Sequence, residues 1–286
     1  MPPRFWPASP WMCPTPPPRP STEARMRSKG FTLFELLVAM VLVGLIFAAF
    51  LQVFTGTLNQ STLTSARSDL LKEGQIAVQV IASKLQEACY VYPNGATLRM
   101  ADSGYSTQNL RGGYDWTVGS DPILAMLLPP DPNSANPDSY RFFAYYPLLR
   151  GFYNSNAGTS LQLESDPAND NVWVLMEYRR NLDPSITPGD FANPPGSPAP
   201  CATLAQGLTN ADLQGGTARI LVDYVSPQND LFSPNDNPAD PSDTPTAATL
   251  NLRMQRSLQG KNLSVAGGGS GLSVRVFPRN LGVLAP

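Results

Sequence analysis

The chain has 286 residues, of which 42% are hydrophobic and only 15% are charged. It contains no histidine, which excludes Ser-His-Asp and Cys-His catalysis, histidine general bases and histidine-ligated metals. Its three cysteines are far apart, so they form neither a four-cysteine zinc site nor a CxxC redox pair. The net charge of -2 excludes a strongly basic protein that coats nucleic acid.

Residues 1–20 are rich in proline. They hold nine of the 30 prolines of the chain, and such a segment cannot pack a core, so we expect disordered or polyproline-like chain there. Met26 lies just before the first organised feature. The sequence leaves open whether translation starts at Met1 or at Met26.

A long apolar run follows a basic flank. Arg25, Arg27 and Lys29 precede Phe31–Phe54, a run in which Glu35 is the one charged residue. A helix of this length spans about 36 Å, enough to cross the ~30 Å apolar core of a bilayer. By the positive-inside rule the basic flank stays in the cytoplasm and the rest is exported. No A-x-A-like cleavage site follows the run, so we predict a retained single-pass membrane helix.

Glu35 is unusual in such a helix. A carboxylate inside a membrane helix costs roughly 2.5–3.5 kcal/mol and usually has a functional partner; snorkelling to the interface is the alternative. The surrounding string K-G-F-T-L-F-E-L-L-V-A resembles the class III signal of type IV pilins and type II secretion pseudopilins. This resemblance implies that the prepilin peptidase cleaves between Gly30 and Phe31 and N-methylates the new Phe31 terminus.

The resemblance also implies an assembly role for Glu35. In the filaments of that family, the terminal amine of one subunit needs a counter-charge among packed apolar helices. Glu35 is the only acid in the apolar run, so it is the candidate partner of a neighbour's Phe31 amine. A buried ion pair of this kind fixes register more than it adds stability. Gly30 suits the peptidase because it has no side chain and leaves the backbone open.

Beyond residue 54 the pattern predicts an amphipathic helix that continues the apolar one. No proline occurs from Phe31 to Tyr92, so we predict one helix from about Phe31 to Cys89. Residues 31–54 form its membrane or filament-core half, and residues 55–92 lie on a folded head. A coiled coil is the weaker alternative, because the stripe covers fewer than four heptads. The stripe consists of Leu63, Ala66, Leu70, Gly74, Ala77, Ile81, Leu85 and Ala88.

From residue 93 the pattern is typical of β-structure. Alternating apolar and polar residues predict an antiparallel sheet with one face buried against the helix. Two long polar loops, residues 181–200 and 226–247, interrupt the strands. We therefore predict an α+β fold, with a long N-terminal helix packed on one β-rich head at residues 93–286, behind a cleaved leader at residues 1–30. The strand candidates are Ile123–Leu128, Tyr140–Tyr146, Val172–Arg179, Ala218–Val225, Thr249–Gln255 and Leu272–Phe277.

The head is similar to those of PilW-like minor pilins and J-type pseudopilins. The similarity rests on A-C-Y at the helix end, a paired R-I-L-V-D-Y-V and T-L-N-L-R-M-Q, and a closing S-V-R-V-F-P-R-N-L. The proline-rich start departs from the short leaders of the family. Many major pilins carry a helix-breaking proline in the apolar half, and none occurs around Gln52, which favours a minor component.

The loop Asn229–Asp243 is dense in oxygen ligands. Some pseudopilins bind calcium, which makes this loop a candidate calcium site. Its spacing lacks the D-x-[DN]-x-[DN]-G order, and its three prolines explain it as simple turns. We expect no cofactor, with calcium as the alternative. The candidate ligands are Asp230, Asn235, Asp236, Asn237, Asp240 and Asp243.

Charge is unevenly distributed. Residues 244–286 contain five basic residues and no acid, which is compatible with contact to DNA or to acidic neighbours. Solvated strand faces are the favoured explanation, because the segment lacks the interleaved aromatic residues that single-strand binders use. Four carboxylates, Asp121, Asp131, Asp138 and Glu164, have no spacing that calls for a glycosidase pair.

Two cysteines remain after the implied cleavage, because Cys13 lies in the leader. Cys89 and Cys201 both fall on the exported side, where disulfides persist, and they are the sole pair available. A bond would tie the Pro-rich loop before Cys201 to the helix end. Two separate thiols are the alternative.

The sequence therefore predicts a structural minor pilin or pseudopilin, not an enzyme. Its expected partners are the prepilin peptidase, other pilin or pseudopilin subunits, the inner-membrane assembly platform and membrane lipid, with DNA as a speculative addition. It would prime or tip a type IV pilus or a type II secretion pseudopilus in adhesion, motility, DNA uptake or secretion. The alternative is an exported binding module or enzyme on a single-pass anchor.

Overall fold

The computed structural model describes residues 32–133, 136–186, 200–235, 245–265 and 271–281. The described residues divide into two units, one that ends at Gly56 and one that begins at Thr57. One helix, α1 (Leu33–Glu87), begins in the first unit and ends in the second. The predicted continuous helix is confirmed, and its C-terminal end lies two residues before Cys89. Helix boundaries differ by this much between criteria.

The predicted stripe of α1 is the face that the head buries. Its members from Leu70 to Ala88 are buried, while Leu63 and Ala66 are half-buried. Val78 joins them as an additional buried residue. The spacing of three and four therefore identified the contact face correctly, because side chains at these intervals share one side of an α-helix.

The main sheet of the head has seven antiparallel strands in the order β1-β4-β5-β6-β7-β10-β11. Its long central strands, β5 and β6, pair over nine residues from Arg141↔Asn181 to Leu149↔Trp173. The bounds are β1 (Tyr90–Val91), β4 (Leu124–Leu128), β5 (Arg141–Leu149), β6 (Trp173–Asn181), β7 (Thr217–Val225), β10 (Met254–Leu258) and β11 (Lys261–Val265).

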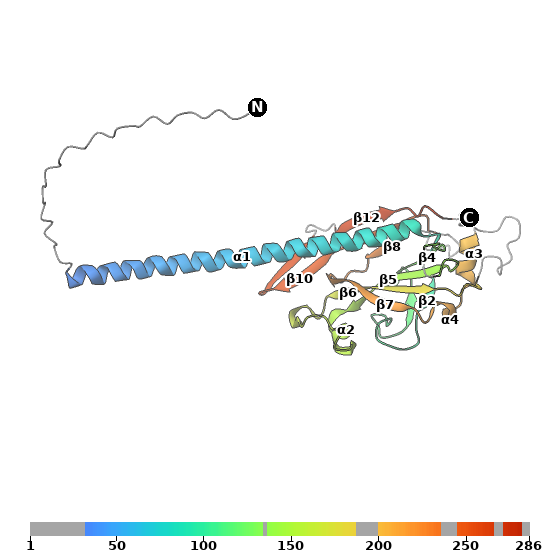
Figure 1. The fold of residues 1–286 in the computed structure, drawn as a ribbon, viewed down its shortest axis with the longest axis horizontal. Coiled ribbons are helices and arrows are strands. Elements are labelled where there is room, and N and C mark those ends of the chain that lie inside the picture. The colour runs from blue at the N-terminus through green and yellow to red at the C-terminus, as the bar shows by residue number, and fades with distance from the viewer. Residues whose placement is uncertain (1–31, 134–135, 187–199, 236–244, 266–270, 282–286) are drawn as a thin grey trace, which may run out of the picture. The chain divides into compact units, whose positions relative to one another are not determined.

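Two smaller sheets and four short helices complete the described part of the head (Figure 1). One small sheet has the strand order β12-β9-β8, and the other pairs β2 with β3. Their bounds are β2 (Thr97–Arg99), β3 (Asp115–Thr117), β8 (Phe232–Pro234), β9 (Ala248–Leu252) and β12 (Leu272–Val276). The short helices are α2 (Arg150–Asn156), the 3₁₀ helix η1 (Pro167–Asn169), α3 (Pro200–Gly207) and α4 (Asn210–Leu213).

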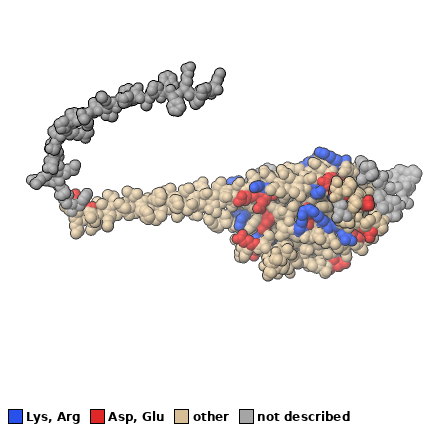
Figure 2. Space-filling view, viewed as in Figure 1, with Lys and Arg blue, Asp and Glu red and all other residues tan. Residues whose placement is uncertain are grey.

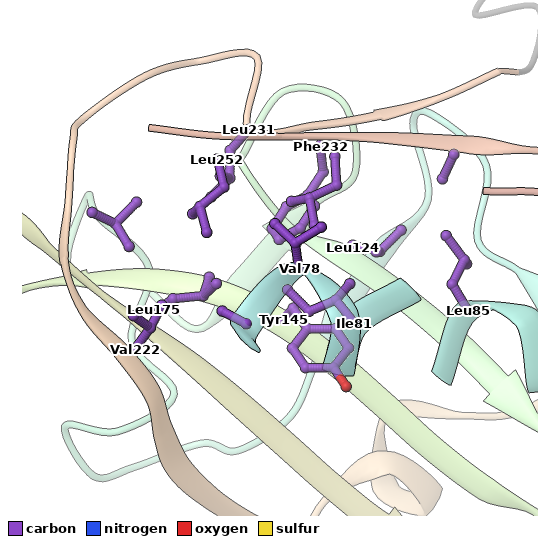
Figure 3. Close-up of a cluster of buried hydrophobic side chains, with 14 of the residues drawn as sticks. Val78, Ile81, Leu85, Leu124, Tyr145, Leu175, Val222, Leu231, Phe232 and Leu252 are labelled. Carbon is purple, nitrogen blue, oxygen red and sulfur yellow. The ribbon is translucent and has the colours of Figure 1, made fainter. Parts of the chain in front are cut away.

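The buried stripe of α1 packs between the two larger sheets. Its core cluster combines Val78 and Ile81 with residues of both sheets. Figure 3 shows Tyr145 of the large sheet on one side of Ile81 and Phe232 of the small sheet on the other side of Val78. The helix therefore has sheet contacts on two sides, and this cluster forms the main hydrophobic core.

The prediction that only one face of the sheet is buried was wrong. All five residues of β4 are buried, and a second core lies on the opposite face of β4, β5 and β6. That core contains Trp116 of the small β2-β3 sheet and Leu204 of α3, together with residues of the central strands such as Phe142 and Tyr146. The central strands therefore carry apolar residues at nearly every position, as strands covered on both faces do.

Four predicted strands match β4, β5, β6 and β7, and a fifth matches β12. The candidate Thr249–Gln255 is wrong as a single strand, because it divides at Arg253 into β9 of the small sheet and β10 of the large one. The expected pairing of R-I-L-V-D-Y-V with T-L-N-L-R-M-Q is reduced to one position, Val225↔Met254. The alternation of apolar and polar residues continues through Arg253, so the sequence pattern gives no sign that one strand ends there and another begins.

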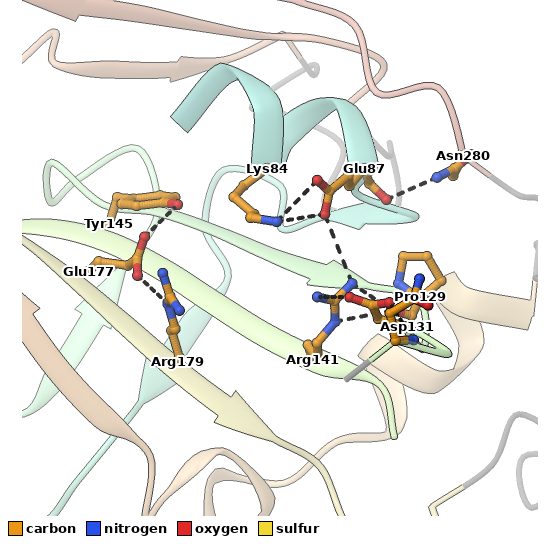
Figure 4. Close-up of polar contacts among 10 residues, drawn as sticks. Lys84, Glu87, Pro129, Asp131, Arg141, Tyr145, Glu177, Arg179 and Asn280 are labelled. Atoms are coloured by element: carbon orange, nitrogen blue, oxygen red, sulfur yellow. Dashed lines mark hydrogen bonds and ion pairs between the residues drawn. The ribbon is translucent and has the colours of Figure 1, made fainter. Parts of the chain in front are cut away.

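The C-terminal segment after β12 caps the end of α1. The backbone N–H of Arg279 donates to the Gln86 carbonyl over 3.0 Å. The Asn280 side chain donates to the Glu87 carbonyl over 3.1 Å (Figure 4). The last carbonyls of a helix lack intrahelical partners, so these two bonds satisfy acceptors that would otherwise need water.

Gly74 permits the close packing of α1 on both sheets. A Cβ at this position would lie 3.0 Å from Leu272 Cδ1 and 3.1 Å from Met254 Cγ. We expect Gly74→Leu to lower the free energy of unfolding of the head by about 1–3 kcal/mol through overpacking, less the small gain in helix propensity. Thermal unfolding of the full chain in detergent measures it. Gln75→Leu, at the exposed neighbouring position, is the control, and equal melting temperatures for the two variants would contradict this account.

Candidate processing and assembly site

The first half of α1 is an exposed apolar surface. Its large hydrophobic side chains, from Leu33 and Phe34 to Phe54, are exposed in the isolated chain, and Figure 2 shows this stretch almost entirely without charge. By length and composition, α1 is the one helix among the described residues that could cross a membrane, with a mean hydropathy of 2.7 in its most apolar window. Apolar surface on this scale requires lipid or other apolar helices around it.

Glu35 closes a hydrogen-bonded ring at the start of α1. Its Oε2 atom accepts from the Thr32 backbone N–H at 2.9 Å and from the Thr32 hydroxyl at 3.0 Å. The Glu35 N–H in turn donates to Thr32 Oγ1 at 3.3 Å. This reciprocal pattern is a capping box, which satisfies donors that the first turn of a helix leaves free.

The capping box gives Glu35 a role that the sequence interpretation missed. The signal was present as T-L-F-E, since Ser or Thr followed three residues later by Glu is the capping-box pattern. The box holds the carboxylate at the end of the helix that lies nearest the cleavage position. Gly30 and Phe31 themselves lie outside the described residues. Cleavage there, and pairing of Glu35 with a neighbour's amine, stay predictions.

Cys89 and Cys201 lie together. The structure joins them in a disulfide with 5.9 Å between their Cα atoms, within the usual range for such a bond. Both residues are buried in the second core, one just beyond the end of α1 and the other in α3. The geometry required by the predicted pairing is therefore available, while its formation in the exported protein stays a prediction.

The four carboxylates considered for catalysis have separate surroundings. Asp121 pairs with Arg111 at 2.7 Å, and Asp131 pairs with Arg141 at 3.4 Å. Asp138 and Glu164 are exposed. Within the described residues, no contact joins any two of the four.

The candidate calcium loop is only partly described. Asp230 pairs with Arg253 at 3.1 Å, and the Asn235 side chain accepts a hydrogen bond from Thr246. Asp236, Asn237, Asp240 and Asp243 lie outside the described residues. No group of three or more acidic or cysteine side chains within metal-binding reach occurs in the part of the chain that the structure describes.

Three of the basic residues near the C-terminus each contact a different neighbouring residue. Arg253 pairs with Asp230, Arg256 lies 4.5 Å from the centroid of the Tyr224 ring, and Arg275 stacks over Phe277. Each of these three guanidinium groups therefore has a local partner.

Two buried charged residues were not predicted as important. Glu177 of β6 is 0% exposed, and it accepts hydrogen bonds from Tyr145 and Arg179 (Figure 4). It also accepts a hydrogen bond from Arg219. Burial and the neighbouring Glu177 carboxylate raise the pKa of Tyr145, so its hydroxyl stays a donor. The sequence signal was an acid inside the apolar run V-W-V-L-M-E-Y-R-R, because such a residue in a covered strand needs partners.

Arg150 is the second, at 1% exposure. It donates to Asp223 Oδ2 at 2.9 Å and to the Glu164 carbonyl at 2.6 Å, and it stacks on Tyr224. Burial raises the pKa of the Asp223 carboxyl, although the hydrogen bond from Arg150 opposes that shift. This cluster links α2 to β7. We assign it a structural role, because removing one partner of a buried ion pair destabilises the folded protein.

Glu73 of α1 lies in the field of the same cluster. Burial, followed by repulsion from Asp223 and Asp69, raises its pKa above 4.5. A raised pKa in the folded state means that the stability contribution of Glu73 is present at low pH and is lost as pH rises through the raised value. Glu73→Gln should therefore stabilise the head at pH 7, by less than about 1 kcal/mol because the side chain is exposed. The resulting gain in melting temperature over the wild type should shrink as pH falls toward 4.5, because protonation removes the charge of Glu73 in the wild type.

Thermal scans of the full chain in detergent between pH 4.5 and 8 measure this effect. Glu164→Gln is the matched control, because that glutamate is also exposed but does not belong to α1. Greater stability of the wild type than of Glu73→Gln at pH 7 would contradict the expected sign of the effect.

Comparison with known proteins identifies one family motif, which overlaps the first half of α1. Residues 25–51 match the family model of the prokaryotic N-terminal methylation motif. No curated protein and no solved structure gave a match to the chain. An apolar N-terminal helix that carries this motif and continues into an α+β head fits a membrane-anchored, exported protein of the pilin type. This motif supports placement of the chain in the type IV pilin and pseudopilin family, and it implies a prepilin peptidase and other pilin subunits as partners.

Proposed function

We propose that this chain is a structural minor pilin or pseudopilin, which primes or tips the filament of a type IV pilus or a type II secretion pseudopilus. The observation that carries the proposal is the methylation motif on an exposed apolar helix that continues into the buried stripe of a folded head. The proposal includes removal of residues 1–30 in the cytoplasm, a filament-core segment at residues 31–54, a connecting helix at residues 55–92 and a head at residues 93–286 on the exported side.

The chemistry of such a subunit is assembly rather than catalysis. The inner-membrane platform would extract the apolar helix from lipid and stack it against other subunits. Glu35 would then accept a hydrogen bond from the methylated Phe31 amine of its neighbour. The head would supply surfaces for adhesion, motility, DNA uptake or secretion. The capping box supports this proposal, because it holds the carboxylate at the helix end where that amine must arrive.

Processing gives the direct test. We expect the protein from the cell envelope to begin at Phe31 with a methylated amine, because the string from Lys29 to Glu35 resembles the peptidase signal with its cut between Gly30 and Phe31. N-terminal sequencing and mass spectrometry of the purified protein measure it. A Gly30→Glu chain should keep its leader, while Gly56→Ala, a helical glycine with open space around it, should be processed normally. A mature terminus beyond Phe54 would overturn the proposal and favour an ordinary secreted protein.

The alternative is an exported binding module or enzyme on a single-pass anchor. It predicts that the protein stays in the membrane fraction and never enters sheared filaments. Co-fractionation with other pilin subunits separates the two functions.

A further inference from the structure

β7 has an open edge in the middle of the large sheet. On one side it pairs with β6 along its length, but on the other it pairs with β10 only at Val225↔Met254. Among the described residues, positions 217–223 therefore have no ladder partner on their outer side. Register shifts between Trp173 and Met176 of β6 and a positive φ of 60° at Tyr224 accompany the divergence of β10 from β7. Bulges of this kind bend a strand and increase its twist.

Such an edge is a template for another strand. Every second residue of an edge strand directs its N–H and C=O outward, and these groups pair readily with an extended chain. Residues 217–223 are exposed or half-buried throughout except Val222, so an incoming backbone has access to most of the segment. Proteins usually blunt such edges with charge or cover, and here one arginine, Arg219, is the only cation on the segment.

A hollow borders this edge on one face of the sheet. It has a volume of about 390 Å³, and Ala218 and Ile220 of β7 form part of its wall. Tyr105 and Tyr153 meet edge-to-face on the same wall, with 5.7 Å between their ring centroids. Leu161, which is 60% exposed, adds an apolar side chain that the fold leaves uncovered. A single apolar side chain from an added strand would cover these groups.

The opposite face of the edge carries an excess of positive charge. Arg219 is 56% exposed, and it shares the buried Glu177 carboxylate with Arg179. Two guanidinium groups therefore face one carboxylate. An acidic side chain placed over Arg219 would balance the remaining charge at close range.

We propose that the open edge of β7 binds an extended peptide segment of a partner protein as an added strand. The segment has an apolar residue next to an acidic one. Adjacent residues of a strand point to opposite faces, so the apolar side chain enters the hollow while the acidic side chain reaches Arg219. Main-chain hydrogen bonds supply affinity in this mode of recognition, and the alternate side chains supply specificity.

The test uses the full mature chain in detergent micelles and a fluorescein-labelled probe peptide, Thr-Val-Thr-Phe-Glu-Val-Thr-amide. Fluorescence anisotropy gives the dissociation constant, and hydrogen exchange locates the bound strand. We expect the peptide to protect alternate amides of residues 217–223 and no other part of the sheet. Of two peptides N-methylated at even or at odd positions, one should lose binding, because only one set of amides faces the edge.

Variants of the chain separate the two side-chain contacts. Leu161→Ala should weaken binding about five- to tenfold through lost apolar contact in the hollow. Leu149→Ala, an exposed leucine outside the hollow, is the matched control and should leave binding unchanged. Arg219→Gln should abolish the preference for the Glu peptide over the same peptide with Gln, whereas the wild type should prefer Glu several-fold.

Three outcomes would overturn the proposal. The first is equal binding of the unmodified peptide and both N-methylated peptides. The second is protection at a site other than residues 217–223. The third is protection of those residues without peptide that grows with protein concentration, which would assign the edge to a second copy of this chain instead. None of these outcomes depends on whether the protein enters a filament.

Discussion

Glu35→Ala is expected to lower incorporation of this subunit into filaments at least tenfold while leaving membrane insertion as good as or better than in the wild type. Removing the carboxylate removes a membrane-insertion cost of roughly 2.5–3.5 kcal/mol. It also leaves the neighbour's amine without a counter-charge, which costs about 3–5 kcal/mol when a buried pair is broken. The ratio of the protein in sheared filaments to that in membranes, measured by immunoblot, reports the difference. This expectation rests on the proposed assembly function.

The capping box requires a sharper experiment, because Glu35→Ala removes both the charge and the cap. Glu35→Gln keeps a side chain that completes a capping box but carries no charge. Thr32→Val removes the cap, worth about 1 kcal/mol, and keeps the carboxylate. If pairing with the amine is the main role, Glu35→Gln behaves like Glu35→Ala, and Thr32→Val stays within a few-fold of the wild type. Normal incorporation of Glu35→Gln would assign Glu35 to the cap and contradict the pairing.

Much of α1 could be predicted because its signals are local. An uninterrupted run without proline, a stripe with spacings of three and four, and Pro93 with Gly95 beyond its end are all readable within one helix. Gly74 is instructive, since glycine is a poor helix former. Its place in the stripe is explained by Leu272 and Met254, which leave no room for a larger side chain. Those contacts join residues nearly 200 positions apart, which no local pattern encodes.

The sheet was predicted less completely, for two physical reasons. Burial on both faces removes the alternation that marks a strand, so β4 looks like any short apolar run. A strand that changes sheets keeps its alternation, so the break at Arg253 could not be seen. Strands of two or three residues, such as β1 and β8, exist only because a neighbour pairs with them. Tertiary context decides such elements.

The same division applies to the candidate site. The motif around Gly30, Phe31 and Glu35 is contiguous, so the sequence contained it in full. The capping box was also readable as T-L-F-E, but these residues were interpreted only as the start of the membrane helix. In contrast, Glu177, Arg150 and the open edge of β7 depend on which strands become neighbours. Arg219 of β7 lies directly opposite Glu177 on the neighbouring strand β6, a relation that follows from register alone.

Breaking the bond between Cys89 and Cys201 is expected to have the largest effect on the stability of the head. The two residues are 112 positions apart, and the chain-entropy model gives about 4–5 kcal/mol for a loop of that length. A domain of this size loses roughly 2–4 °C of melting temperature per kcal/mol, so the double variant Cys89→Ala with Cys201→Ala should melt about 8–20 °C lower. Thermal unfolding with and without reductant measures this difference.

Reductant gives the experiment its internal control. It should lower the melting temperature of the wild type toward that of the double variant and leave the double variant unchanged. Cys13→Ala should have no effect on the mature protein, because Cys13 lies in the leader that the proposed processing would remove. Both sulfurs are buried, so part of any loss in the alanine variants comes from packing, and the shift with reductant isolates the contribution of the bond itself. Recovery of Cys89 and Cys201 as free, alkylatable thiols from the unfolded, unreduced protein would show that the bond does not form after export. Packing alone would then hold α3 against the rest of the head.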